Sequence, residues 1–149
     1  MSDIIAILDQ MRASSGKPET IGLSNGTILD FASRDNKLIQ AIEEAKIKQK
    51  EFSNELLMMD ESSLVAHLQK DYVNFYAPAT INPYVAIAAK GPWIVTSHGA
   101  VVHDNGGYGM LGGGHGPDDI IHAMSQNHVM ANVMTPSISQ ARLAAALKK

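Results

Sequence analysis

The sequence predicts an α+β protein, with a group of N-terminal helices, a small antiparallel sheet of three strands within residues 93–111, and further helices after it. Two changes along the chain support this fold class. The first half is charged and carries apolar residues at helical spacing. The second half is apolar, and seven of the twelve glycines fall between Gly106 and Gly116. Helix should therefore clearly exceed strand.

The N-terminal region begins with a predicted helix that Asp3 can cap. The apolar side chains that recur at helical spacing in it are Ile4, Ile7, Leu8 and Met11. Residues 14–18 contain glycine and proline and should end this helix. Residues 22–26 then predict a turn, with Asn25-Gly26 as its sharpest signal, and residues 27–29 predict a short strand.

The longest predicted helix is charged, begins at a cap formed by Ser33 or Asp35, and runs to about Leu57. A further helix should start near Asp60, which is its predicted cap. The apolar face of that helix is formed by Leu64, Val65, Leu68 and Tyr72.

The region that follows is expected to form the sheet. Prolines at positions 78, 83 and 92 exclude a long helix between them. Residues 93–96 and 100–102 are apolar and strand-like, and the short polar segment between them predicts a hairpin. Residues 104–107 predict a second turn, and residues 108–111 predict the third strand.

Two more helices are predicted in the C-terminal part. Pro117 suits the first position of a helix over residues 118–130, because the acids that follow it suit a helix N-terminus. Ser137 or Ser139 should cap a last helix over residues 140–149. An apolar run inside that helix would need a partner to cover it. We therefore expect the chain to be one part of a longer protein.

The composition limits the class of protein. The net charge is -3 and no basic face is apparent, which argues against a nucleic-acid partner. The absence of cysteine excludes a disulfide framework and a thiolate metal site. No apolar run approaches the roughly 20 residues of a membrane span, and no basic leader precedes an apolar segment. We expect a soluble, cytoplasmic protein without membrane contact.

Three patterns could carry chemistry. Residues 107–112 match G-x-G-x-x-G, but two acids open the helix after them and would repel a phosphate, so a glycine-rich turn is the favoured interpretation. The six histidines form no i,i+4 pair, so no metal site is predicted. Ser97 and His98 are neighbours, a poor arrangement for proton transfer, and no G-x-S-x-G occurs, so a hydrolase is not predicted.

An ordered set of elements in the second half resembles a known family. A hairpin leads from Gly99 to Asp104, a glycine-rich segment follows, then Gly114-His115-Gly116-Pro117, then a helix to Gln126. In this order the chain resembles, from Asn74 to Leu147, the class III (ornithine-type) aminotransferases of the fold type I pyridoxal-phosphate enzymes. Gly116 stands where the family has the second histidine of its G-H-x-H-P motif.

The resemblance implies that the full-length protein moves an amino group from an amine or amino acid to a 2-oxo acid, with pyridoxal phosphate as cofactor. It implies four substrate-contacting residues in the glycine-rich segment: Tyr108, Met110, Gly112 and Gly113. The family's Schiff-base lysine, pyridine aspartate and phosphate cup lie downstream of the matched region. We therefore expect no catalytic, cofactor-binding or metal-binding residue in this chain, and no activity from the chain alone.

The resemblance also implies three segments. Residues 1–72 would be a helical N-terminal extension, residues 73–131 a segment of the small domain, and residues 132–149 the start of a truncated large domain that binds the cofactor.

The family's members are dimers with active sites at the subunit interface, so the resemblance implies a homodimer or higher oligomer. Aromatic residues crowd the stretch that holds Tyr72, Phe75, Tyr76, Tyr84 and Trp93, and we expect the segment from Tyr72 to Tyr84 to lie partly at the interface. The other interpretation of these rings is that they pack on the small sheet of the same chain. The alternative is a stand-alone interaction module without catalytic activity, whose partner-binding arm would be the charged helix over residues 33–57.

Overall fold

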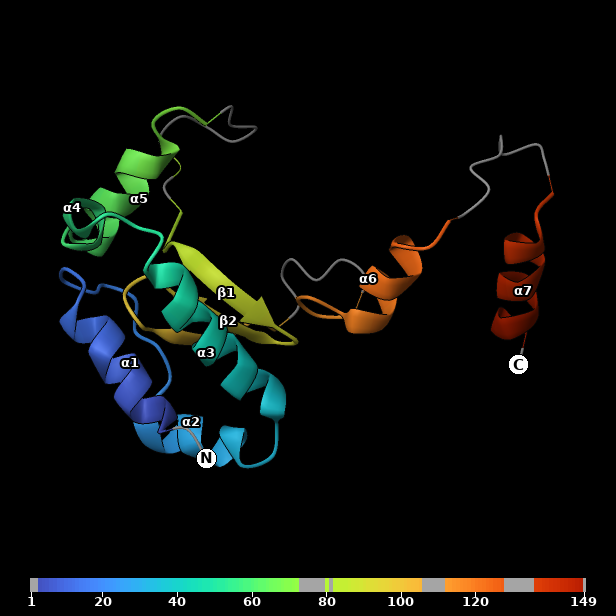
Figure 1. Ribbon diagram of the computed structural model, residues 1–149, viewed down its shortest axis with the longest axis horizontal. Coiled ribbons are helices and arrows are strands. Elements are labelled where there is room, and N and C mark those ends of the chain that lie inside the picture. Colours follow the sequence, from blue (N-terminus) through green and yellow to red (C-terminus); the bar gives the residue numbers. More distant parts are fainter. Residues whose placement is uncertain (1–2, 73–79, 81, 106–111, 128–135, 149) are drawn as a thin grey trace. The chain divides into compact units, whose positions relative to one another are not determined.

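A computed structural model describes residues 3–72, 80, 82–105, 112–127 and 136–148 (Figure 1). Its contacts divide the chain into two units, Met1–Pro117 and Asp118–Lys149, which we describe separately. The predicted α+β class is confirmed, because helices predominate in the described residues and accompany one small antiparallel sheet. The segments predicted to end at residues 72 and 131 concern the parent protein and remain a prediction.

The first unit contains five helices and three strands among its described residues. In chain order they are α1 (Ile4–Ala13), α2 (Asn25–Ala32), α3 (Asn36–Gln49), α4 (Asn54–Leu57), α5 (Glu61–Gln69), β1 (Ala86–Lys90), β2 (Trp93–Thr96) and β3 (Val101–His103).

The first helix forms as predicted, whereas the predicted turn and strand after it are wrong. Asp3 caps α1 by accepting a hydrogen bond from the backbone N–H of Ala6 at 3.1 Å. Residues 25–32 form α2, because Ser24 accepts from the backbone N–H of Thr27 and acts as an N-cap. The Asn25-Gly26 pair therefore lies in the first turn of a helix, and Ile28 points into the core.

The long charged helix is shorter than predicted. Asp35 is its cap, and α3 ends at Gln49 rather than near residue 57. Gln49 is buried, and its side-chain amide donates to the backbone oxygens of Met11 and Ser97 at 3.0 and 2.9 Å. Ser53 then caps the separate helix α4. The apolar sequence continues through this break, so periodicity alone could not locate it.

The sheet has the order β1-β2-β3 and is antiparallel throughout. The β2–β3 hairpin is confirmed, with Ile94 opposite Val102. The strand predicted at residues 108–111 lies outside the described residues, as do residues 106 and 107 of the turn predicted at residues 104–107. The third strand of the observed sheet is β1, which the sequence did not predict because alanine and lysine have low strand propensity.

One core joins the N-terminal helices to the sheet. α3 lies against the sheet and α1 packs beside α3 (Figure 1), and Leu8, Leu38 and Ile42 of these helices are fully buried. Trp93 and Val95 of β2 belong to the same cluster. The N-terminal helices and the sheet therefore share one hydrophobic core.

The second unit contains α6 (Asp118–Met124) and α7 (Ile138–Leu147) among its described residues. α6 begins as predicted but ends before the predicted residue 130. At its end, the Ser125 hydroxyl donates to the backbone oxygen of His122 at 2.8 Å, a local bond that competes with helix continuation. Ser137, not Ser139, caps α7, and Gln140 completes a capping box with it.

In the part of the chain that the structure describes, none of the helices has both the length and the apolar character needed to cross a membrane.

Candidate functional site

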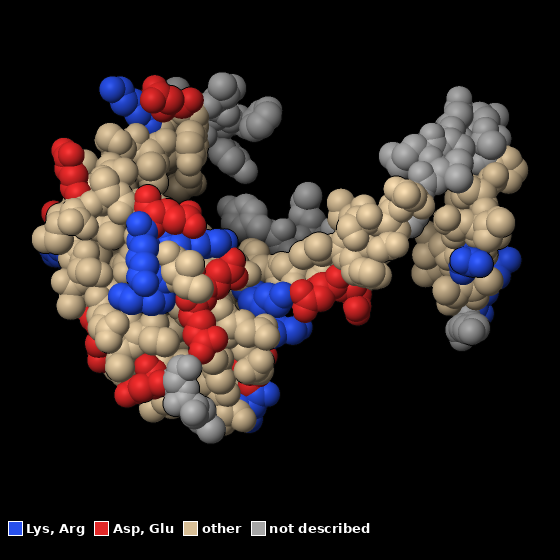
Figure 2. Space-filling view, viewed as in Figure 1, with Lys and Arg blue, Asp and Glu red and all other residues tan. Residues whose placement is uncertain are grey.

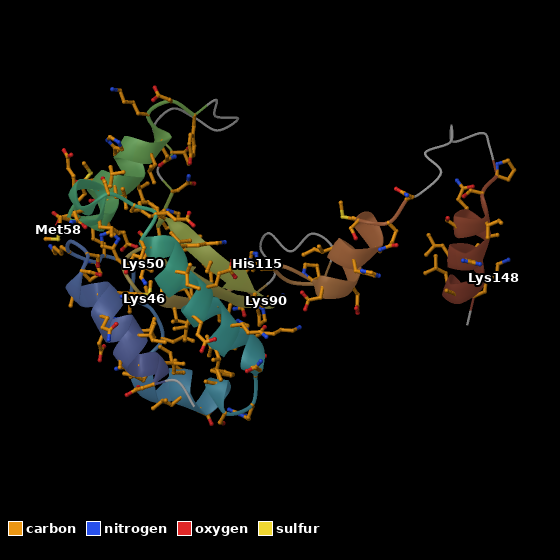
Figure 3. All side chains as sticks on the ribbon, in the orientation of Figure 1. Lys46, Lys50, Met58, Lys90, His115 and Lys148 are labelled. Atoms are coloured by element: carbon orange, nitrogen blue, oxygen red, sulfur yellow. The ribbon has the colours of Figure 1, made fainter. Side chains whose placement is uncertain are left out.

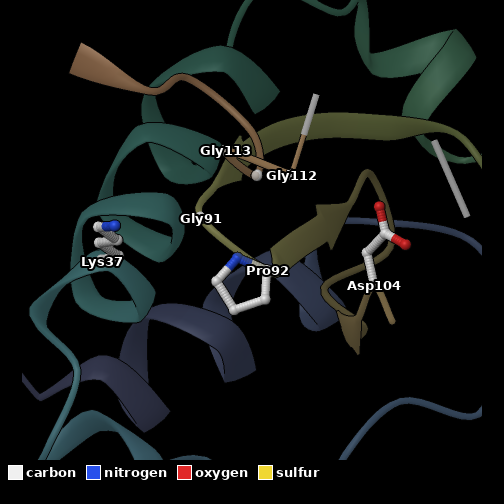
Figure 4. A pocket seen from close by; sticks show the side chains of 7 residues that line it. Lys37, Gly91, Pro92, Asp104, Gly112 and Gly113 are labelled. Atoms are coloured by element: carbon white, nitrogen blue, oxygen red, sulfur yellow. The ribbon is translucent and has the colours of Figure 1, made fainter. Parts of the chain in front are cut away.

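A pocket of about 270 Å³ lies beside the turn that connects β1 to β2 (Figure 4). Its walls are the turn residues Gly91 and Pro92 and the glycines at positions 112–114. Lys37 and Asp104 line it on opposite sides of the turn. The pocket is slightly smaller than the roughly 300–1,000 Å³ of drug-sized ligand sites, so it suits a small molecule.

The turn under the pocket requires glycine. Lys90 pairs with Trp93 across the hairpin, which leaves Gly91 and Pro92 as a two-residue connection. Gly91 has a φ of +56°, in the left-handed region that favours glycine. A Cβ at Gly91 would also lie 2.9 Å from Cδ of Lys37. The missing side chain therefore lets the aliphatic stem of Lys37 lie over the turn.

A second chain segment is fixed to this turn by backbone hydrogen bonds. The backbone N–H of Gly91 donates to the oxygen of His115, and the N–H of His115 donates to the oxygen of Gly91, each at 2.8 Å. Gly114 has a φ of +70°, and a Cβ there would lie 2.7 Å from the backbone oxygen of Gly91. Glycine at this position therefore permits the close approach that carries His115 to the turn.

Asp104 and His115 form a side-chain contact at the edge of the pocket. Nε2 of His115 lies 2.9 Å from Oδ2 of Asp104, and the two side chains are 28% and 11% exposed. The backbone N–H of Asp104 donates to the oxygen of Pro92 at 2.7 Å. Since an ionised carboxylate only accepts, Nε2 of His115 is the donor. The contact joins β3 to the glycine-rich segment across the β1–β2 turn.

Lys37 occupies an electrostatically unusual place. It is the second residue of α3, and its backbone N–H donates to Oδ1 of Asp35 at 3.0 Å. Cations are disfavoured near a helix N-terminus, where the backbone amides already carry partial positive charge. Within the described residues the Lys37 ammonium forms no ion pair. The pocket therefore has one unpaired cation on its α3 side.

The remaining charges are mixed. On the face shown in Figure 2, acidic and basic side chains alternate over the first unit and do not gather into one basic field. Lys46 lies in the last turn of α3 and Lys50 caps the end of that helix, and neither lines the pocket, whereas Lys90 lies near His115 at the end of β1 (Figure 3). Nζ of Lys90 lies 3.9 Å from the position a Cβ would take at Gly116.

The structure places only part of the predicted substrate-contacting set. Gly112 and Gly113 line the pocket, whereas Tyr108 and Met110 lie outside the described residues. Sequence reasoning missed Lys37 as a pocket residue, because its helix is far from the glycines along the chain. A lysine in the first turn of a helix, against the helix dipole, is the signal that could have singled it out.

Ser97 and His98 form a structural network. Both are buried, and the Ser97 hydroxyl lies 3.0 Å from Nδ1 of His98. Nε2 of His98 lies 2.9 Å from the backbone oxygen of Met59, which only accepts, so Nε2 carries the proton and Ser97 donates to Nδ1. The serine proton points to an imidazole that is buried and bound on its other side to Met59, so the pair ties the β2–β3 turn to the segment before α5.

Glu61 is the other buried polar feature. It is fully buried, and its Oε2 accepts from the backbone N–H groups of Glu19 and Thr20 at 2.7 and 2.6 Å. These bonds hold the segment between α1 and α2 against α5. Its Oε1 is buried without a partner among the described residues. No group of three histidine, aspartate or glutamate side chains in the described part of the chain could hold a metal ion.

The pocket does not suit pyridoxal phosphate by itself. That cofactor needs an amine for its aldehyde, an acid for its pyridine nitrogen and donors for its phosphate. The described lining offers one ammonium, on Lys37, and one carboxylate, on Asp104, that is already bonded to His115. One lysine cannot serve the aldehyde and the phosphate at once.

Comparisons of the chain with family models, with curated proteins and with solved structures give no match.

Proposed function

We propose that this chain is the N-terminal part of a class III aminotransferase, a pyridoxal-phosphate enzyme that moves an amino group from an amine or amino acid to a 2-oxo acid. The proposal rests on the resemblance of the ordered elements from the β2–β3 hairpin to the helix that follows Pro117. The contact between Asp104 and His115 at 2.9 Å is the observation that supports it most directly. Those two residues stand at separate motif positions of the resemblance.

The contact between Asp104 and His115 suggests a role for the glycine-rich segment. The glycine-rich segment is fixed at its far end by His115, through the side-chain contact with Asp104 and two backbone bonds to Gly91. A segment that contacts a substrate must be held in place, because misplacement of positioning groups lowers catalytic rates steeply. In the proposed parent protein, the small domain would supply this substrate-contacting wall. The cofactor would be bound by the downstream parts that the resemblance implies.

The proposal predicts no catalysis by these 149 residues alone. With added pyridoxal phosphate, the chain should show no internal-aldimine absorbance, and borohydride should fix no cofactor on any of its lysines. The gene provides the complementary measurement. Downstream of codon 149, an open frame should encode a serine-glycine phosphate cup and a later lysine. A borohydride-stable adduct on a lysine of this chain, or a gene without those elements, would overturn the proposal.

The same measurements address the alternative of a stand-alone interaction module. Its predicted arm is not free, since Leu38, Ala41 and Ile42 of α3 are fully buried in the core. A module of this kind would offer a partner only the charged outer face of that helix. It would also be a monodisperse, cooperatively melting protein with a specific partner, whereas we propose that the parent protein is a homodimer or higher oligomer.

A further inference from the structure

Three backbone amides and one ammonium at the pocket are left without partners. Within the described part of the chain, the N–H groups of Gly112, Gly113 and Gly114 donate to no acceptor, and the ammonium of Lys37 forms no ion pair. All four residues line the same pocket. Successive amides in a glycine turn form concave sites for anions, and a helix N-terminus adds partial positive charge on the side of Lys37.

The charges of the lining select the kind of anion. Asp104 also lines the pocket, so the single positive charge of Lys37 is opposed by a carboxylate on the other side of the turn (Figure 4). An organic phosphate carries about −1.5 to −2 charges at pH 7 and would be repelled more strongly than a monoanion. A carboxylate carries one charge and about four lone-pair sites, which match one ammonium and a few amides.

We propose that this pocket binds the carboxylate group of a small organic acid, with Lys37 as its counter-ion and the backbone of residues 112–114 as the second wall. The size of about 270 Å³ and the apolar ring of Pro92 suit an acid with a short carbon chain. That this acid is the amino acid or 2-oxo acid of a transamination rests on the proposed function. The carboxylate site itself follows from the lining residues.

The test is a titration of the 149-residue chain followed by ¹H–¹⁵N NMR at constant ionic strength, without cofactor. The probe is propionate, with the neutral propionamide and inorganic phosphate as comparisons. Propionate should shift the amide signals of Gly112 to Gly114 saturably, with a Kd on the order of 1–10 mM. Propionamide should cause no saturable shift, and phosphate should bind more weakly than propionate.

Two substitutions of equal charge identify the counter-ion. Lys37→Gln should raise the Kd for propionate about tenfold or more, because it removes a charge-assisted hydrogen bond. Lys46→Gln changes the net charge equally on the same helix but away from the pocket (Figure 3), and it should change the Kd less than about twofold. Lys37→Arg, which keeps the charge, should retain binding. Thermal unfolding of each variant checks that the fold is retained.

Three results would overturn the inference: no saturable shift with propionate up to about 100 mM, tighter binding of phosphate, or equal affinities of the Lys37→Gln and Lys46→Gln variants. The assay contains no cofactor and measures no turnover, so a negative result refutes the carboxylate site without bearing on the proposed function. If the chain binds the carboxylate but its gene encodes no downstream lysine, the proposed carboxylate site is supported and the proposed aminotransferase function is refuted. If the gene encodes that lysine but the chain does not bind the carboxylate, the aminotransferase function is supported and the carboxylate site is refuted.

Discussion

Asp35 links a helix cap to the sheet at the scale of a single side chain. Its Oδ1 accepts from the backbone N–H of Lys37 at 3.0 Å, and its Oδ2 accepts from Nε1 of Trp93 at 2.7 Å. Trp93 is almost fully buried and packs its ring against Phe31 and His103. One carboxylate therefore fixes the start of α3, and with it Lys37, relative to β2, the first strand of the β2–β3 hairpin.

Replacement of Asp35 by alanine should lower the free energy of unfolding by roughly 2–4 kcal/mol. About 1 kcal/mol comes from the lost N-cap, and the rest comes from the Trp93 N–H, which loses its acceptor in a buried environment. Asp35→Asn keeps the cap but offers only one acceptor oxygen, so its loss should be about half as large. Urea unfolding measures each value.

The control for this prediction is Asp30→Ala. Asp30 pairs with Arg34 on the exposed surface of α2, where an ion pair contributes less than about 1 kcal/mol. Equal losses for the Asp35 and Asp30 variants would show that the Trp93 contact does not stabilise the fold.

The segment of residues 112–115 forms the second wall of the pocket and has a defined backbone conformation, although it is neither helix nor strand. It depends on two glycines that differ in one respect. Gly112 and Gly114 both have positive φ, of +66° and +70°. A Cβ at Gly112 would meet no described atom within 4 Å, whereas one at Gly114 would lie 2.7 Å from the backbone oxygen of Gly91.

We expect Gly112→Ala to cost about 1–2 kcal/mol, the penalty of the left-handed conformation alone. Gly114→Ala adds a backbone clash and should separate the segment from the turn, so the His115 amide should lose protection from hydrogen exchange. Its protection factor should fall at least about tenfold further in Gly114→Ala than in Gly112→Ala. Equal protection in the two variants would contradict the role of the Gly91–His115 contact.

Self-association is the property of the whole molecule that the sequence predicts. Tyr72 is 59% exposed, and an aromatic ring can bury about 150–250 Å² against a partner. Of the other aromatic residues in this stretch, Phe75 and Tyr76 lie outside the described residues, and Trp93 is buried in the core of its own chain. Sedimentation equilibrium at micromolar concentration should show a homodimer or higher oligomer. A monomer of 16.0 kDa across a tenfold dilution would refute it.

The placement of this interface has its own test. Tyr72→Ser should raise the dimer Kd about tenfold, because truncation of an interface tyrosine commonly costs more than 1 kcal/mol. Ile21→Ser is the matched control, since Ile21 is 97% exposed and lies in the segment between α1 and α2. An unchanged Kd in the Tyr72 variant would show that Tyr72 does not lie at the interface, without contradicting the predicted oligomer.

Local rules of the sequence were sufficient for most of the helices and for the hairpin. Asp3, Asp35 and Ser137 each accept a backbone hydrogen bond, as capping residues should. The β2–β3 hairpin followed from two apolar runs around a polar turn. These predictions depend on residues within a few positions of one another, so no tertiary information was needed for them.

Tertiary structure decided the features whose cause lies far away along the chain. Gln49 ends α3 with its side chain bound to Met11 and Ser97, and β1 forms because β2 offers it a partner despite its weak strand propensity. The pocket depends on the same kind of contact. Lys37 of α3 and the glycines at positions 112–114 line the pocket together, and they are neighbours only because α3 packs on the sheet.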